Sequence, residues 1–111
     1  MEPSGQLNEV ITNYRKHKWK LRRVLLRTET RAQIIAAGTL VFEDASVEES
    51  EIDALWFSRP SHEGREAWEL RLVADTPYAL FETFEPDESE EEREELRREM
   101  EARLRDYARR A

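Results

Sequence analysis

The first residues that could carry chemistry are Ser61, His62 and Glu63, which place a hydroxyl, an imidazole and a carboxylate in successive positions. A zinc site of the H-E-x-x-H type needs both histidines on one face of a helix. Pro60 and Gly64 instead predict a turn here. Neighbouring residues in a turn do not fix the geometry of a nucleophile, its base and an orienting acid. We therefore predict no catalytic residue and no metal ligand in this segment.

The carboxylates and glycines of the chain, and its lack of cysteine, do not indicate a particular reaction either. The chain has 25 carboxylates, and its sequence does not show which of them is buried with a raised pKa. It has no cysteine, which excludes disulfides and thiolate metal sites, and its three glycines form no phosphate-binding loop. We therefore predict no cofactor, and an interaction protein rather than an enzyme. An enzyme would need an aromatic-lined pocket in which buried acids converge.

Cations gather in the first third of the chain. Residues 1–39 carry a net charge of +5 and residues 40–111 a net charge of −12. Apolar residues spaced by three, four and seven predict an amphipathic helix over Gln6–Leu26. Residues three and four apart are neighbours on a helix, so the other face becomes basic. That face contains Arg15, Lys16, Trp19, Lys20, Arg22 and Arg23. It is typical of binding to nucleic-acid phosphates, with Trp19 or Tyr14 stacking on a base.

Other interpretations of the basic face stay open. It could be a solvated face that pairs with the acidic remainder of the chain, or it could bind a protein with an acidic surface. Membrane binding would require a free apolar face, and the sheet needs that face as its cover. Residues 85–95 hold eight acids and one arginine. If the two long helices lie antiparallel, these acids would neutralise the basic helix and weaken the case for nucleic-acid binding.

Three short apolar runs, at 54–58, 67–73 and 78–84, predict an antiparallel meander. In the second run Trp68, Leu70 and Leu72 alternate with Glu69 and Arg71, as in a strand with one buried side. Turn-forming residues occupy 59–65 and 75–77. Because a three-stranded meander is not stable alone, the two ends of the chain must supply helices that cover it.

Capping signals predict two further helices. Thr30 with Gln33 and a following glycine favour a helix over 28–37. Ser89 with Glu92, acids in the first turns and arginines in the last favour a helix over 90–110. We interpret 39–43 as a fourth strand, 44–51 as an acidic linker and 1–5 as a disordered N-terminus.

These elements predict a single α+β domain over residues 1–111, with two N-terminal helices, an antiparallel meander of three or four strands and a long charged C-terminal helix. This last helix would pack on the sheet or on the first helix. Aromatic residues occur on both sides of the strands, and one helical layer covers only one face, so we expect an exposed aromatic face. The expected contacts are Trp56, Phe57, Trp68, Tyr78, Phe81 and Phe84.

We therefore predict a non-enzymatic protein–protein interaction or adaptor module that self-associates as a homo-oligomer. Binding of a nucleic-acid backbone through the first helix is the alternative. The longest apolar run is far shorter than the roughly 20 residues that span a bilayer. The first five residues lack the basic and apolar regions of a signal peptide. We expect a cytoplasmic protein that does not bind membranes.

Overall fold

The computed structural model describes residues 3–37, 42 and 45–110. In chain order the elements are α1 (Pro3–Lys16), β1 (Lys20–Leu26), α2 (Thr28–Ala37), β2 (Ser46–Glu49), β3 (Ala54–Pro60), the short 3-10 helix η1 (His62–Gly64), β4 (Glu66–Leu72), β5 (Tyr78–Phe84) and α3 (Glu90–Arg110). The described strands form one sheet in the order β2-β1-β3-β4-β5. Strands β1 and β2 are parallel and the other neighbours are antiparallel. The α+β class is confirmed, with a mixed sheet.

The predicted meander corresponds to β3, β4 and β5, and the predicted helices over 28–37 and 90–110 are α2 and α3. Ser89 and Glu92 exchange the hydrogen bonds of a capping box, with the Glu92 N–H donating to Ser89 Oγ at 3.1 Å and the Ser89 N–H donating to Glu92 Oε1 at 3.4 Å. The capping signal of α3 is therefore confirmed, whereas Thr30, the expected cap of α2, lies inside that helix and donates its hydroxyl to Asp53.

The predicted helix over Gln6–Leu26 is wrong in its second half. Helix α1 ends at Lys16, and Lys18 takes a left-handed φ of 71° before β1 begins. A β-bulge explains the misleading pattern, because the register of β1 against β3 shifts between Leu21 and Arg23. Leu21 and Val24, three residues apart, consequently share one face of the sheet. A bulged strand thus imitates the spacing of a helix.

The structure also corrects the predictions of a disordered N-terminus and of an acidic linker. Residues 3–5, which we expected to be disordered, belong to α1. The expected acidic linker over 44–51 contains β2, which pairs with β1 at the edge of the sheet. The sequence of β2 has a single apolar residue, Val47, and all four of its residues are exposed or only partly buried, so no apolar pattern indicates a strand here. The expected strand over 39–43 lies outside the described residues, apart from Phe42.

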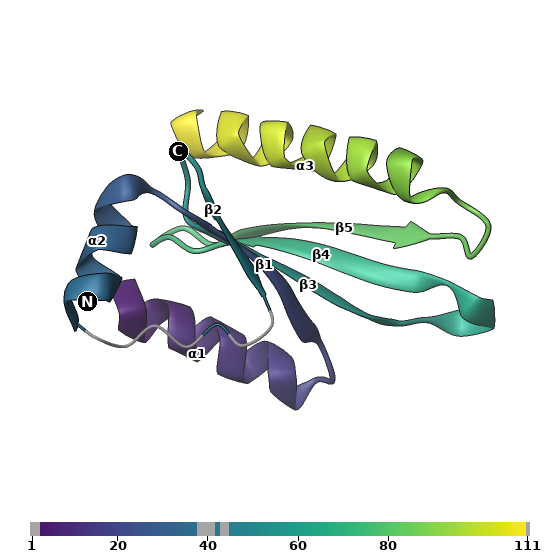
Figure 1. The fold of residues 1–111 in the computed structure, drawn as a ribbon, viewed down its shortest axis with the longest axis horizontal. Helices are drawn as coiled ribbons and strands as arrows, with labels where there is room; N and C mark the ends of the chain where they lie inside the picture. Colours follow the sequence, from purple (N-terminus) through teal and green to yellow (C-terminus); the bar gives the residue numbers. More distant parts are fainter. Residues whose placement is uncertain (1–2, 38–41, 43–44, 111) are drawn as a thin grey trace.

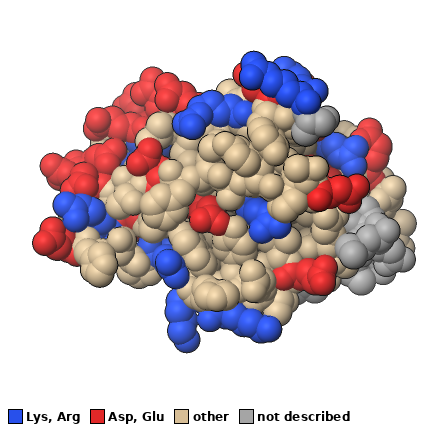
Figure 2. All heavy atoms as spheres, turned by 180° about the vertical axis from the view of Figure 1, so that it is seen from behind, with Lys and Arg blue, Asp and Glu red and all other residues tan. Residues whose placement is uncertain are grey.

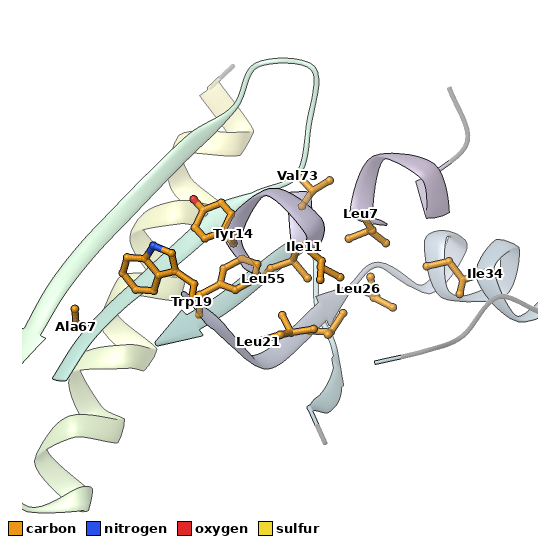
Figure 3. Packing of buried hydrophobic residues seen from close by; sticks show 12 residues of the cluster. Leu7, Ile11, Tyr14, Trp19, Leu21, Leu26, Ile34, Leu55, Ala67 and Val73 are labelled. Atoms are coloured by element: carbon orange, nitrogen blue, oxygen red, sulfur yellow. The ribbon is translucent and has the colours of Figure 1, made fainter. Parts of the chain in front are cut away.

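Helices cover both faces of the sheet (Figure 1). Helices α1 and α2 pack on one face, where Leu7, Ile11, Tyr14 and Ile34 meet residues of β1 and β3, as Figure 3 shows. Helix α3 packs on the other face, where Met100 and Leu104 are buried against the sheet. The expectation of a single helical layer is therefore wrong. No helix among the described residues is long and apolar enough to cross a lipid bilayer.

Candidate interaction surface

The two helical layers bury most of the aromatic residues that we expected to be exposed. Trp56, Phe57, Trp68 and Phe84 are at most 4% exposed. Two of the six predicted contacts remain at the surface, since Tyr78 is 41% and Phe81 is 59% exposed. Both belong to β5. Of the predicted aromatic surface, only the part on β5 is therefore exposed.

Strand β5 is an edge of the sheet, and within the described residues no strand pairs with its outer side. The Thr83 N–H donates to Glu82 Oε1 at 3.0 Å, so this N–H points away from β4. Backbone direction alternates along a strand, which turns the backbone groups of Ala79 and Phe81 outward as well. An edge of this kind can pair with another strand.

Phe81 lies on the face of the sheet that carries α1. Its ring meets Trp19 edge-on, with the ring centroids 6.5 Å apart, and the Arg59 guanidinium lies 4.4 Å from the centroid of Trp19. A hollow of about 440 Å³ opens beside these groups and is lined in part by Lys18 and His62. Phe81 therefore has an aromatic neighbour on one side and solvent on the other.

Tyr14 joins α1 to the face on which Phe81 lies. Its ring stacks on Phe57 at 4.1 Å between centroids, and its hydroxyl donates a hydrogen bond to the carboxylate of Glu69 on β4. Burial, followed by the hydrogen bond and charge of Glu69, raises the pKa of Tyr14 to about 12, while Arg71 acts in the opposite direction. The tyrosine is therefore neutral at physiological pH and holds α1 against β4.

The residues expected on one basic helical face lie on two elements. Arg15 and Lys16 are exposed on α1, whereas Lys20, Arg22 and Arg23 belong to β1. Trp19, the proposed stacking residue, is only 9% exposed. Figure 2 shows Lys and Arg side chains along the lower edge of the molecule, and Asp and Glu side chains at the end where α3 begins. A single basic helix face is thus absent from the described residues, and nucleic-acid binding stays a prediction.

A hollow of about 530 Å³ lies where the start of β3 and the end of β4 meet α1, α2 and α3. Asp53 lines it, but its carboxylate accepts hydrogen bonds from Thr30 Oγ1 at 2.7 Å and from the Arg27 N–H at 2.9 Å. Among the described lining residues none is aromatic. Across residues 3–37, 42 and 45–110, no group of three or more His, Asp or Glu side chains is placed to hold a metal ion. Of the three acids that line this hollow, Glu51 and Asp75 are exposed and Asp53 is partly buried.

Comparison of the chain with protein-family models, with curated proteins and with solved structures gives no match in any of the three. A function must therefore be argued from the surfaces described above.

Proposed function

We propose that this chain is a protein-interaction module that pairs its β5 edge with the β5 edge of a second copy. The supporting observation is that an aromatic side chain, Phe81, is 59% exposed at the centre of an edge strand. Large exposed aromatic groups contribute strongly to interfaces. Pairing of two edges adds backbone hydrogen bonds to that contribution.

The outward-facing backbone N–H and C=O groups of β5 can pair with the same groups of a second copy. Antiparallel pairing around a twofold axis at Phe81 sets Ala79 opposite Thr83 of the second copy and Phe81 opposite its own equivalent. Residues with outward backbone groups then face each other and exchange N–H···O bonds in pairs. The same surface serves both copies, as a twofold dimer requires.

Helix α3 gives this arrangement complementary charge. The ring of Tyr107 stacks on Tyr78 with centroids 4.0 Å apart, and the Arg93 guanidinium lies 5.7 Å from the ring of Phe84. Helix α3 is therefore antiparallel to β5, and its middle lies over the middle of that strand. In the proposed dimer the acidic first half of α3 lies beside the arginine-rich second half of its counterpart.

The distance between the two copies of α3 in this dimer also suits helix packing. Strands are about 4.8 Å apart, so a helix over the β4–β5 pair lies about one strand spacing from the twofold axis. The two copies of α3 would then be roughly 10 Å apart, near the upper end of the usual range for packed helices. Exposed Glu99 and Arg103, near the middle of α3, are in reach of the second helix.

Replacing Phe81 with lysine is expected to weaken dimerisation at least tenfold, because the change removes an aromatic contact and sets two like charges at the axis. Sedimentation equilibrium over a range of concentrations measures the effect. Ile35→Lys is the matched control, since Ile35 is 57% exposed and lies on α2. The control should keep the dimerisation constant of the unchanged chain.

Cysteines introduced at Ala79 and Thr83 test the register. The chain has no cysteine of its own, and paired strands bring opposite Cα atoms to about 5.5 Å, within reach of a disulfide. The double variant should therefore give a covalent dimer on mild oxidation. If the unchanged chain at high concentration has the mass of a single chain, self-association is refuted. If it dimerises but the double cysteine variant does not cross-link, this register is refuted.

A further inference from the structure

The β-bulge in β1 has an effect on side-chain direction. Arg23 pairs with Trp56 while Leu21 pairs with Phe57, so Arg22 is the extra residue. Successive side chains normally alternate between faces, but a bulge turns two neighbours to the same face. The Arg22 guanidinium lies 5.5 Å from the ring of Trp68, and Arg23 bonds to Glu94 of α3. Both arginines therefore project toward α3.

These arginines form one wall of a groove between β1 and the first turns of α3. The groove has a volume of about 520 Å³, which is within the usual range for ligand pockets. Its described lining contains five cations, namely Lys20, Arg22, Arg23, Arg93 and Arg97. The bulge thus completes a cationic groove that includes three of the residues predicted to bind nucleic acid.

Arg93 and Arg97 line the side of the groove formed by α3. Arg97 is 3% exposed, and its guanidinium stacks 4.0 Å from the ring of Trp68. Its Nη1 donates to Glu90 and to Glu94, each at 3.1 Å. The Nε atoms of Arg93 and Arg97 are buried with no hydrogen-bond partner among the described residues. Arg97 is therefore almost fully withdrawn from solvent, and Arg93 is partly withdrawn.

The acids nearby compensate only part of this charge. Glu94 pairs with Arg23 at 2.5 Å, Glu90 with Arg97 at 3.1 Å, and Glu66 with Arg93 at 3.8 Å. Partial burial favours the neutral form of Glu94, but bonds from Arg23 and Arg97 outweigh burial and lower its pKa. Five cations therefore face three acids. Within the described residues, Lys20 and Arg22 have no ion-pair partner, which leaves two positive charges.

We propose that this groove binds the phosphate group of a compact phosphorylated small molecule. Two uncompensated charges match a phosphate dianion, and guanidinium groups bind phosphate oxygens in pairs. The acidic run of α3 lies next to the groove, and Figure 2 shows acidic side chains gathered at this end of the molecule. A nucleic-acid strand that continued beyond the groove would meet these acids, whereas a compact anion would not.

Isothermal titration calorimetry at low salt, with inorganic pyrophosphate as the probe, tests the site. We expect saturable binding of one pyrophosphate per chain. The double variant Lys20→Gln and Arg22→Gln should weaken it at least tenfold, because it removes the two uncompensated charges. The matched control, Arg15→Gln and Lys16→Gln, makes the same change in net charge on α1 and should keep the affinity within twofold. Circular dichroism verifies that both variants are folded.

A single-stranded oligonucleotide serves as the comparison ligand. Absence of pyrophosphate binding by the unchanged chain, or equal losses in the two double variants, would overturn the proposed site. Tighter binding of the oligonucleotide than of pyrophosphate, with a steep dependence on salt, would overturn the choice of a compact ligand in favour of a nucleic-acid backbone. None of these outcomes depends on dimerisation through β5, so this test and the sedimentation test can fail separately.

Discussion

Replacing Glu101 with alanine is expected to lower the free energy of unfolding by about 2–4 kcal/mol. Glu101 is 4% exposed and accepts a hydrogen bond of 2.8 Å from Nε1 of Trp56, which is fully buried. Its other oxygen accepts a bond of 2.9 Å from Arg98. The substitution leaves the indole N–H without an acceptor in the core and removes a fixed contact between α3 and the sheet.

Urea denaturation followed by circular dichroism measures this effect. Glu95→Ala is the matched control, because Glu95 is an exposed glutamate on the same helix and should change stability by no more than about 0.5 kcal/mol. Glu101→Gln keeps an acceptor for the indole but loses the charge that faces Arg98, so an intermediate loss is expected. Equal effects of the two alanine substitutions would show that the Trp56–Glu101 bond does not anchor α3.

Elements with strong local signals could be predicted from the sequence. Strand β4 alternates between apolar and charged residues, and α3 begins at a capping box, so each was located within a residue or two. Strand β2 was missed because only its pairing with β1 makes it a strand. The second half of the first predicted helix was wrong because a bulge depends on the pairing partner, which a local pattern does not contain.

The candidate surfaces depended even more on tertiary structure. Trp56 and Phe81 belong to strands of the same sheet and both are aromatic, yet Trp56 is fully buried beneath α3 and Phe81 is largely exposed. The difference arises from which part of each face the helices cover, and the helices come from the two ends of the chain. The cationic groove combines β1 with α3, about 70 residues later in the chain, as the bond between Arg23 and Glu94 shows. Residue types indicated the chemistry, but not which residues meet.

Raising the pH through the range from about 10 to 12 is expected to destabilise the chain through Tyr14, which is 8% exposed. Its pKa is raised from 10.0 to about 12 in the folded state, so the unfolded chain loses this proton first. The stability from the protonated hydroxyl is fully present below pH 10 and is lost as the pH rises through 12. A shift of this size corresponds to about 2–3 kcal/mol. Chemical denaturation at several pH values measures it, and Tyr14→Phe should abolish this part of the pH dependence.

The variant Glu69→Gln separates the two main causes of the raised pKa. It keeps an acceptor for the tyrosine hydroxyl but removes the negative charge, while burial of the ring against Phe57 is unchanged. Because burial is the larger cause, the pKa of Tyr14 should fall only part of the way toward 10.0. The chain has three tyrosines, so the titration of Tyr14 is the difference in tyrosinate absorbance between each chain and the same chain with Tyr14→Phe. A complete return to 10.0 would mean that the charge of Glu69, rather than the packing of α1 on the sheet, keeps this tyrosine protonated.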